Sequence, residues 1–296
     1  MDQFEAMKAF VAVATLGSFT QAARRLRISP SAVTRSVAQL EDRLGLTLLN
    51  RTTRSVRLTD RGQLYLESSR QILEDVEAGE RRARGENARP RGLLHVAAPI
   101  LFGRLHVLPM ISRLLAAHPA LTVRLTLSDR NVHLVDDGVD VALRIGELAD
   151  SSLVAMNLGT VSRVLVASPA YLAAHGSPSR PADLEDHALI AFEGLEITDA
   201  WRFSATDVRV TPRLAVNSAD TAIAAAEAGL GITRALSYQV SAAVQAGRLV
   251  PMLQAFAPSA MPVSVVSPAR RVGSANAAAF VTAAQDHLRS NPLAPI

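Results

Sequence analysis

Two short amphipathic segments near the start of the chain have the spacing of a helix-turn-helix. Ser18 precedes residues 19–26 and Ser29 precedes residues 30–44, and each hydroxyl can accept an amide proton of the first helical turn. Pro30 opens the second segment, where its missing N–H removes no hydrogen bond. The inward stripe of this segment comprises Val33, Val37, Leu40 and Leu44. The pattern therefore predicts two helices joined by a short turn.

The outward face of residues 30–44 carries the side chains that a recognition helix needs. Small hydroxyls and an arginine can donate to base edges and phosphates in a major groove. The candidate groove residues are Ser29, Ser31, Thr34 and Arg35. Ser29 and Ser31 have a second interpretation, because capping the helix would occupy their hydroxyls. We expect a DNA-binding surface along this face.

A basic segment with alternating apolar residues follows. Within residues 46–60, Thr, Val and Leu alternate with Arg51, Arg54 and Arg57, which predicts a two-stranded wing with a basic outer face. Arginines in such a position usually hold a protein on the phosphate backbone and do not read sequence. We predict phosphate contacts for Arg51 and Arg54, the alternative being solvated charge.

Charge is unevenly distributed along the chain. Residues 1–91 contain 16 Lys and Arg against 11 Asp and Glu, whereas residues 92–296 contain 15 against 16. A basic excess confined to the N-terminal part indicates a polyanionic partner for that end alone. Lys8 is the only lysine, which we attribute to genome composition more than to phosphate recognition.

Residues 63–87 form a long amphipathic pattern in which acids interleave with arginines. Its apolar face is wider than a monomeric surface helix needs, so we interpret it as a dimerising linker helix, the alternative being a solvated connector. The sequence Arg89-Pro90-Arg91-Gly92 interrupts this pattern and predicts a domain boundary. The predicted divisions are residues 1–62 for the winged helix-turn-helix domain, 63–88 for the linker helix, 89–91 for a hinge and 92–296 for a further domain.

The rest of the chain alternates between strand and helix patterns, which predicts an α/β fold with mainly parallel sheets. Strands are expected at residues 93–98, 121–128, 139–145, 163–167, 189–192, 213–216 and 263–266. Helices are expected at residues 103–117 with a kink at Pro109, at 132–137, from Ser168 onward, at 181–184, at 218–228 and at 275–290. Ligands of such folds bind beyond the carboxyl ends of the strands.

Composition argues against several classes of protein. The 296 residues include no cysteine, which excludes disulfides and cysteine metal sites and suits a reducing cytoplasm. The N-terminus has early acids and no long apolar run, so we expect no signal peptide, and no uninterrupted apolar stretch is long enough for a membrane span. We find no Gly-x-Ser-x-Gly elbow and no Ser/His/Asp constellation, and therefore predict no catalytic residues. His133 with Asp136 and Asp137 lacks a second histidine at ligand spacing, so we predict neither a metal nor a cofactor.

Two sets of residues carry a resemblance to a known family. The first set is Phe10, Ala14, Gly17-Ser18-Phe19-Thr20, Ala22-Ala23, Leu26, Ser29-Pro30-Ser31-Ala32-Val33-Thr34, Leu40-Glu41, Leu44-Gly45, Arg51-Thr52, Leu58-Thr59 and Gly62. The second set is Gly92-Leu93-Leu94, Asp140-Val141-Ala142, Arg144-Ile145-Gly146, Ser168-Pro169-Ala170-Tyr171-Leu172, Trp201-Arg202-Phe203 and Gly229-Leu230-Gly231-Ile232. Over essentially its whole length, the chain resembles the LysR-type transcriptional regulators.

This resemblance implies a winged helix-turn-helix, a linker helix and an effector region of two Rossmann-like subdomains similar to periplasmic binding proteins. It implies that subdomain one covers residues 92–162 plus 267–296 and subdomain two covers residues 163–266, with a small ligand in the cleft between them. It also implies a cytoplasmic homotetramer, built as a dimer of dimers, that binds an inverted-repeat operator in double-stranded DNA and no membrane.

Three positions depart from the family pattern. Leu49-Asn50 stands where Leu-Phe is usual, which we expect to loosen packing under the wing. His133 stands where Asp is common, and Ala235-Leu236 stands where Leu-Pro is frequent. Because the last two lie near the expected cleft, we do not carry over the ligand preference of any relative.

Strand ends supply the candidate effector residues. The loop Ala98-Pro99-Ile100 can offer backbone amides at a helix N-terminus, a seat for a carboxylate, and Asn217-Ser218 can do the same from the opposite lobe. Arg144 ends a strand and either pairs with an anion or forms a structural salt bridge with Asp140 or Glu147. Gly229 and Gly231 are expected to end a helix and form a tight turn; the dinucleotide fingerprint around them is incomplete. We therefore expect an anionic metabolite as effector.

Two functional hypotheses follow. In the first, the chain is a ligand-responsive DNA-binding regulator whose effector binds one arrangement of the lobes better than another and so changes the spacing of the DNA-binding heads. In the second, it is a solute-binding or catalytic α/β protein with an appended helical domain. The basic wing and the absence of a signal peptide favour the first, and detectable turnover of a metabolite would favour the second.

Overall fold

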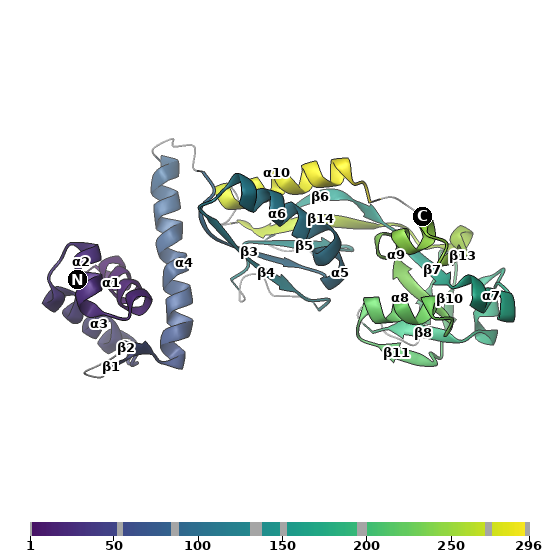
Figure 1. Cartoon of the computed structure of the whole chain (residues 1–296), viewed down its shortest axis with the longest axis horizontal. Coiled ribbons are helices and arrows are strands. Elements are labelled where there is room, and N and C mark those ends of the chain that lie inside the picture. The colour runs from purple at the N-terminus through teal and green to yellow at the C-terminus, as the bar shows by residue number, and fades with distance from the viewer. Residues whose placement is uncertain are drawn as a thin grey trace. The chain divides into compact units, whose positions relative to one another are not determined.

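The chain folds as two compact units, Met1–Ala88 and Arg89–Ile296 (Figure 1). In this computed structural model, the described residues are 2–51, 56–83, 89–130, 138–148, 153–193, 200–269 and 274–293. Each unit has a hydrophobic core of its own, so each is described by itself.

The N-terminal unit consists of helices and one two-stranded wing. Its elements are α1 (Gln3–Leu16), α2 (Phe19–Leu26), α3 (Pro30–Leu44), β1 (Leu49–Arg51), β2 (Val56–Leu58) and α4 (Asp60–Ala83). The core includes the fully or almost fully buried side chains of Phe10, Val13, Ala22, Ala23, Val33, Val37, Leu40, Leu48 and Leu49. The predicted helix pair and antiparallel wing are confirmed.

Hydrogen bonds from α3 and from the start of α4 hold the wing in place. Glu41 Oε1 accepts the amides of Leu48 and Leu49 at 2.8 and 3.0 Å. The Thr59 hydroxyl donates to the Thr47 carbonyl at 2.9 Å and accepts the Gly62 amide at 2.9 Å. α4 begins at Asp60, so Gly62 lies inside its first turn and not at the end of the wing.

The departure at Leu49-Asn50 places the asparagine on the surface. Leu49 is 2% exposed and packs in the core, whereas Asn50 is exposed. Because side chains alternate between the two faces of a strand, the residue after a buried leucine points outward.

The first sheet of the C-terminal unit has the strand order β4-β3-β5-β14-β6. Its strands are β3 (Gly92–Ala98), β4 (Leu121–Leu127), β5 (Val141–Ile145), β6 (Leu153–Val161) and β14 (Met261–Pro268). β3 runs parallel to β4 and β5, whereas β14 runs antiparallel to β5 and β6. The carboxyl ends of β3, β4 and β5 therefore meet at one edge, where the loops that follow them lie together.

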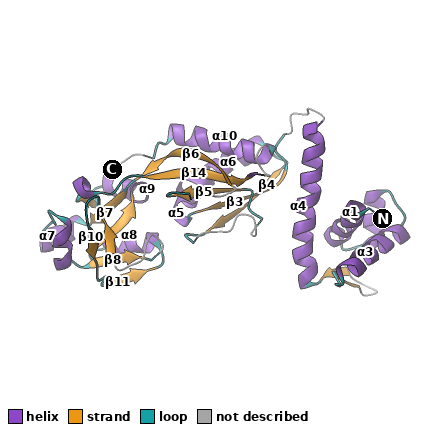
Figure 2. Ribbon diagram, turned by 180° about the vertical axis from the view of Figure 1, so that it is seen from behind, coloured by secondary structure: helices purple, strands orange, loops and turns teal. Residues whose placement is uncertain are grey.

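A long helical segment and the C-terminal helix lie side by side over the first sheet (Figure 2). The elements are α5 (Ile100–Phe102), the π-helical turn η1 (Gly103–Val107), α6 (Leu108–Ala117) and α10 (Ala275–Ser290). Pro109 is the second residue after the π turn, so the irregularity predicted there takes the form of a widened turn. Among the described residues, Ile100–Ala117 is the one helix long and apolar enough to cross a membrane, and a core helix has the same composition. Phe102, Val107 and Met110 are fully buried in the core.

The second sheet has the strand order β11-β8-β12-β7-β13. Its strands are β7 (Arg163–Ala167), β8 (Leu189–Phe192), β11 (Leu214–Val216), β12 (Ile232–Leu236) and β13 (Val250–Met252). Its other elements are α7 (Pro169–His175), the 3-10 helices η2 (Pro181–Asp186) and η3 (Gln254–Phe256), α8 (Ala219–Glu227), α9 (Ser237–Gln245) and the hairpin β9 (Ala200–Arg202) and β10 (Asp207–Arg209). β8 is parallel to β11 and β12, whereas β7 is antiparallel to β12 and β13.

Both sheets are therefore mixed, and the prediction of mainly parallel sheets was only partly right. The chain enters β7 from the first subdomain through Ser162 alone. It enters β14 from the second subdomain through residues 253–260, which contain only the short 3-10 helix η3. A parallel neighbour in the same sheet normally requires such a crossover, and these two strands instead run antiparallel to their neighbours.

The return to subdomain one occurs earlier than predicted. We expected residue 267 to begin the returning segment, but β14 already pairs with β5 and β6 from Met261 onward. The buried strand pattern of residues 263–266 indicates a strand without indicating which sheet it joins, which explains the error. The helix predicted for residues 132–137, with His133, lies outside the described residues.

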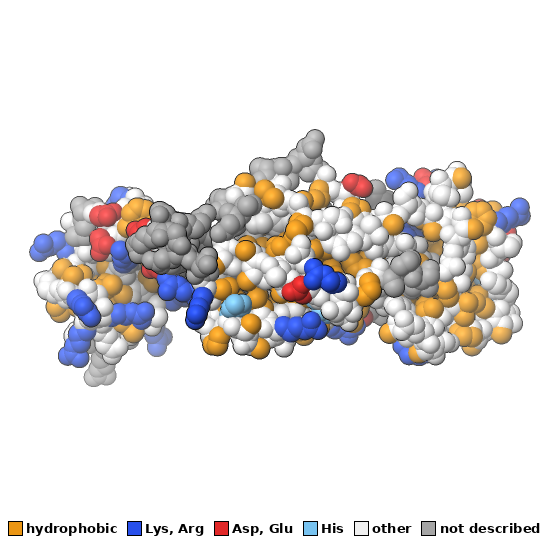
Figure 3. All heavy atoms as spheres, turned by 90° about the horizontal axis from the view of Figure 1, so that it is seen from above, with side chains coloured by type: hydrophobic (Ala, Val, Ile, Leu, Met, Phe, Trp, Pro, Cys, Tyr) orange, Lys and Arg blue, Asp and Glu red, His pale blue; other side chains and the backbone are white. Residues whose placement is uncertain are grey.

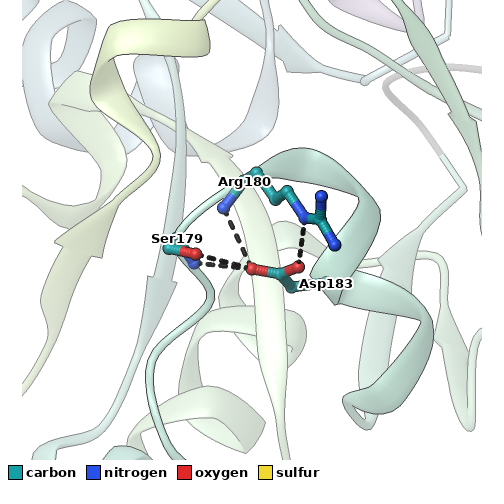
Figure 4. Close-up of polar contacts among 3 residues, drawn as sticks. All are labelled: Ser179, Arg180 and Asp183. Carbon is teal, nitrogen blue, oxygen red and sulfur yellow. Dashed lines mark hydrogen bonds and ion pairs between the residues drawn. The ribbon is translucent and has the colours of Figure 1, made fainter.

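The predicted helical turn at residues 181–184 is confirmed as the start of η2, and one carboxylate organises its entry (Figure 4). Asp183 Oδ2 accepts the hydroxyl of Ser179 at 2.8 Å and the amides of Ser179 and Arg180 at 3.0 and 3.1 Å. Arg180 Nε donates to Asp183 Oδ1 at 2.8 Å. The hydrogen bonds from Arg180 and Ser179 hold the pKa of Asp183 well below its usual range. The cluster holds the loop between α7 and β8 in place, so Ser179, Arg180 and Asp183 have a structural role.

Two histidines meet where the π turn packs on α10. The rings of His106 and His287 have their centroids 5.7 Å apart, and the His106 ring also lies 4.8 Å from the Phe102 ring at a tilt of 37°. Both ring nitrogens of His287 and Nδ1 of His106 are buried without a hydrogen-bond partner among the described residues. Burial, and next the charge of His287, lowers the pKa of His106 from 6.5 to about 4. Burial, and next the charge of Arg113, also lowers the pKa of His287.

Mild acid is expected to destabilise the C-terminal unit through His106. Its pKa is lower in the folded state, so the stabilisation is complete above the unfolded pKa of 6.5 and is lost as the pH falls toward about 4. We expect the free energy of unfolding to fall by about 2 kcal/mol from this residue between pH 7.5 and pH 5. His106→Phe should lose less stability over that range in urea titrations. His118→Gln serves as the control, and an equal loss in the His106 variant would contradict the assignment.

Candidate functional site

The N-terminal end of α3 presents the predicted recognition residues on the surface. Ser29, Ser31, Thr34 and Arg35 are all exposed. Ser29 Oγ accepts the Ala32 amide at 3.1 Å and lies 3.0 Å from Ser31 Oγ. The Thr34 hydroxyl donates to the Pro30 carbonyl at 2.9 Å. Ser29 therefore acts as the N-cap of α3, while its outer side remains accessible to a nucleic acid.

Arg35 is the candidate with the longest reach. It is exposed next to the buried Ser36 and Val37, so it lies on the solvent face of α3. Within the described part of the chain it makes no hydrogen bond or ion pair. A guanidinium that no neighbour holds can contact a guanine edge or a phosphate at small structural cost.

Further arginines surround this face. Arg24, Arg25 and Arg27 are exposed on α2 and in the turn after it, and Arg43 is exposed in the last turn of α3. Lys and Arg side chains are spread over the N-terminal unit in the space-filling view (Figure 3). The side chain of Arg51 in β1 and the whole of Arg54 lie outside what the structure describes.

The C-terminal unit contains a cavity of about 310 Å³ between its two sheets. Its walls are formed by Ala97, Ala98, Pro99, Ser128, Asp129, Arg130, Ala142, Leu143, Arg144, Ile145, Gly146, Arg163, Phe192, Leu236, Tyr238, Gln239 and Met261. The first subdomain contributes the loops after β3, β4 and β5, as expected for the carboxyl ends of parallel strands. The volume is in the lower part of the range for small-molecule sites.

The predicted effector residues fall into two groups. Ala98, Pro99 and Arg144 line the cavity, whereas Ile100 and the pair Asn217-Ser218 are not among its lining residues. Ser218 is the N-cap of α8, and its hydroxyl accepts the Thr221 amide at 3.3 Å.

The Ile100 amide, which we expected to bind a carboxylate of the effector, already donates to a carboxylate of the chain itself. Ile100 N donates to Asp129 Oδ1 at 3.0 Å. Asp129 follows β4 and lines the same cavity. The positive end of the helical segment is thus partly compensated, and this amide is not available to a second carboxylate while Asp129 holds it.

The charged part of the wall is mainly basic. Among the described residues that line the cavity, Arg130, Arg144 and Arg163 are basic and Asp129 is acidic. Burial lowers the pKa of Arg144 from its usual value, although a guanidinium stays protonated at neutral pH. Apolar side chains cover another part of the wall, namely Phe192, Leu236, Tyr238 and Met261. The arrangement suits a small anion with an apolar portion.

Sequence reasoning missed Arg130 and Arg163. Arg130 comes two residues after the predicted strand at 121–128, so the strand-end rule that selected Arg144 could have selected it as well. Arg163 was predicted as the first residue of a strand. It reaches the cavity because the chain passes at Ser162 from one sheet to the other, which no local pattern indicates.

Several contacts connect the two lobes beside the cavity, including a buried apolar cluster with residues from both. Arg104 Nη2 lies 2.9 Å from Asp220 Oδ1, and both side chains are about half exposed. The rings of Phe102 and Tyr238 meet edge to face with centroids 5.2 Å apart. An exposed ion pair contributes about 0–1 kcal/mol, so the Arg104–Asp220 pair adds little to the stability of this arrangement.

Metal binding has no support in the part of the chain that the structure describes. No three His, Asp or Glu side chains come together there in a way that could hold an ion. His133, Asp136 and Asp137 lie outside the described residues.

A winged helix-turn-helix with an exposed basic face, joined to a two-lobed unit with a ligand-sized cavity, defines a ligand-responsive DNA-binding regulator. Comparisons with known proteins agree. Residues 4–63 match the family described as bacterial regulatory helix-turn-helix protein, lysR family, and residues 87–289 match the family described as LysR substrate binding domain.

Relatives extend this match over the whole chain. The HTH-type transcriptional repressor PA14_22550 of Pseudomonas aeruginosa is 36% identical over 298 residues, which span 99% of this chain and 94% of that protein. CrgA, a LysR-type regulator from Neisseria meningitidis, has a solved structure that is 29% identical, covers 96% of this chain and 98% of its own, and has a TM-score of 0.63. The full-length structure of AphB, a Vibrio cholerae virulence activator, is 25% identical, covers 97% of this chain and 100% of its own, and has a TM-score of 0.61.

The chain belongs to the LysR family of transcriptional regulators. Residues 4–63 form the family's helix-turn-helix DNA-binding domain, and residues 87–289 form its substrate-binding effector domain.

Proposed function

We propose that this regulator binds an inverted-repeat operator through Ser31, Thr34 and Arg35 of α3, with Arg51 and Arg54 on phosphates, and that a small anionic metabolite controls this binding. The observation that carries the proposal is the placement of Arg130, Arg144 and Arg163 around one cavity between the lobes. Guanidinium groups bind carboxylates and phosphates through paired hydrogen bonds, so the effector carries such a group.

Recovery of genomic fragments by the purified protein tests this function. At physiological salt, purely electrostatic binding to DNA is weakened, so we expect selected fragments to share a pseudo-palindromic site. The genes beside that site then indicate which metabolites to test. Recovery of unselected DNA alone, with and without candidate ligands, would contradict sequence-specific regulation.

The cavity also allows the alternative of a solute-binding or catalytic protein. We propose that the chain acts by binding and not by catalysis, since its relatives are transcriptional regulators. Conversion by the purified protein of any metabolite that the genes beside the operator suggest would contradict this part of the proposal.

Arg144→Gln is expected to weaken the effector response. In a thermal-shift screen of small carboxylates, we expect compounds with an apolar portion to raise the melting temperature of the wild-type protein, because a ligand that binds only the folded state stabilises it. Loss of one charged hydrogen bond should reduce affinity about tenfold or more. Arg289→Gln is the matched control, because its side chain is 75% exposed and pairs only with the nearby Asp286 among the described residues. Equal shifts in both variants would refute the role of Arg144.

We further propose that α4 dimerises the chain, within a tetramer built as a dimer of dimers in the cytoplasm. Leu64, Ile72 and Val76 are 68, 39 and 37% exposed and are spaced by eight and four residues, so they form one apolar stripe. A stripe of large apolar side chains on a helix needs a partner surface.

Leu64→Glu is expected to dissociate the α4-mediated dimer. The new carboxylate would be buried without a partner if the helices still paired, which is strongly unfavourable. Light scattering after size-exclusion chromatography measures the mass, and Gln63→Glu introduces the same group beside the stripe as the control. An unchanged mass for the Leu64 variant would show that the interface lies elsewhere.

A further inference from the structure

The start of α9 holds two polar side chains at the wall of the cavity between the lobes. Tyr238 and Gln239 both line this cavity. Ser237, which precedes them, is fully buried and is bonded to Ser162: its amide donates to the Ser162 carbonyl at 2.8 Å, and its hydroxyl accepts the Ser162 amide at 3.3 Å. The Tyr238 ring also packs edge to face on Phe102, with centroids 5.2 Å apart. These contacts fix the position of both side chains.

A backbone amide determines the orientation of the Gln239 side chain. The Leu236 amide lies 2.8 Å from Gln239 Oε1 and donates to it. Because a backbone N–H can only donate, the atom that it contacts is the carbonyl oxygen of the glutamine, and the NH₂ group must occupy the other position. Gln239 Nε2 then donates to the Tyr238 hydroxyl oxygen at 3.3 Å. The direction of both hydrogen bonds is therefore determined.

This direction leaves two donors without acceptors at the cavity wall. An amide nitrogen cannot accept, so the Tyr238 proton cannot pair with Gln239. Among the described residues, neither this proton nor the second Nε2 proton of Gln239 has an acceptor. Tyr238 is only 7% exposed. Leaving a buried donor unpaired is unfavourable, so a ligand that supplies an acceptor gains affinity by pairing with it.

The surroundings of Tyr238 indicate which kind of acceptor suits this wall. Burial raises the pKa of Tyr238, and the nearby charge of Asp129 raises it further, so the hydroxyl keeps its proton at physiological pH. The same charge of Asp129, which lines the cavity, repels a second carboxylate. A ligand hydroxyl would bring one more donor to a place that already has two. A neutral carbonyl oxygen has two lone pairs and no proton, and it can accept from both donors.

We propose that Tyr238 and Gln239 bind a neutral carbonyl oxygen of the effector, which makes the effector a small oxo acid. This inference rests on the proposed function, because the acid group is the part of the ligand assigned to the basic wall. The two donors add selectivity to that site: they favour an acid that carries a carbonyl over the same acid with a methylene group in its place.

The residue at position 236 makes the arrangement possible. Proline is frequent in the family at this position, and proline has no backbone N–H. Without that N–H, the Gln239 amide could turn its oxygen toward the Tyr238 proton, and the free donor would be lost. The departure at Ala235-Leu236 therefore changes the chemistry of the cavity, although Leu236 itself is apolar.

Matched acids measure this selectivity in the full-length protein without DNA. Isothermal titration calorimetry compares hexanoate with 2-oxo-, 4-oxo- and 5-oxohexanoate, which place the carbonyl at three distances from the acid group. At least one oxo acid should bind the wild-type protein about five- to tenfold more tightly than hexanoate does. Tyr238→Phe should reduce this ratio to about twofold or less. Tyr65→Phe removes a hydroxyl from α4 in the N-terminal unit and should leave the ratio unchanged.

Gln239→Glu tests the direction of the hydrogen bonds. A glutamate has two accepting oxygens, so one can keep the Leu236 amide while the other takes the Tyr238 proton. The new negative charge should weaken the binding of every acid. The ratio between oxo acid and hexanoate should nevertheless fall to about one, because the free donors are gone.

Two results would overturn the proposal. The first is equal affinity of the wild-type protein for hexanoate and for all three oxo acids. The second is an oxo-acid preference that persists in both Tyr238→Phe and Gln239→Glu, which would place the carbonyl elsewhere. Hexanoate binding that Arg144→Gln weakens, without any oxo-acid preference, would refute the carbonyl site while leaving the proposed anionic effector standing. No binding of any of the four acids would contradict both.

Discussion

Replacing Arg35 by alanine is expected to reduce affinity for the natural operator at least about tenfold. Arg35 is exposed near the N-terminal end of α3. It makes no hydrogen bond or ion pair with another described residue, so its guanidinium is available to DNA. A good arginine–base contact contributes about 1–3 kcal/mol of discrimination against a wrong base, and truncation removes it entirely. Because the side chain packs against nothing in the core, the free energy of unfolding should not change.

Binding curves on operator and on scrambled DNA separate base reading from general charge. If Arg35 reads a base, the variant loses most affinity for the operator and little for the scrambled fragment. Lys8→Ala removes one positive charge from the same domain, where Lys8 pairs with Glu5 at 2.8 Å on α1, and should affect both fragments weakly. A variant that still protects the same operator as the wild type would remove Arg35 from the recognition surface.

Gly62→Ala is expected to destabilise the N-terminal domain by about 3 kcal/mol and to abolish operator binding with it. A Cβ at this position would overlap the Leu48 carbonyl oxygen and stand 2.9 Å from the Leu48 carbonyl carbon. That oxygen accepts the Thr59 amide at 3.0 Å, so relief of the clash breaks the hydrogen bond that closes the base of the wing. Steric overpacking against backbone typically costs about 1–3 kcal/mol, and the lost hydrogen bond adds to it.

The same helix offers a matched control for this change. Gly79 also lies in α4, and a Cβ there would meet no atom within 4 Å. Gly79→Ala should therefore be neutral or stabilise by about 0.5–1 kcal/mol, because alanine favours a helix interior more than glycine does. Denaturation of both variants in urea measures the difference. Equal stabilities would show that the wing can shift to accept a side chain at residue 62.

Local sequence patterns were sufficient to predict the features of the fold that depend on contacts within a few residues. Ser18, Ser29 and Pro30 mark where α2 and α3 begin. The two serines cap the helices by hydrogen bonds to amides three residues later, and the structure contains both bonds. The final helix at residues 275–290 was likewise predicted with its observed limits. Capping and helical periodicity act over one or two turns, which a sequence displays directly.

Information about which sheet a strand joins is not local. β14 and β6 belong to the first sheet through pairings between residues about a hundred positions apart, and β6 was not predicted at all. The candidate effector site shows the same limit. Arg144 was selected because it ends a strand of its own sheet, whereas Arg163 enters the cavity only through the passage between sheets.

The hydrogen bond from Ile100 N to Asp129 Oδ1 determines what concentration of ligand the first cavity can sense at that amide. A carboxylate tethered by the chain has an effective concentration that a free metabolite must exceed before it can displace the side chain, and for short flexible tethers this is in the millimolar range or above. If the effector is the proposed anion, dilute carboxylates should therefore leave Asp129 in place and bind through the arginines alone. Asp129 acts as a built-in competitor, which sets a threshold below which one potential binding group of the cavity does not respond.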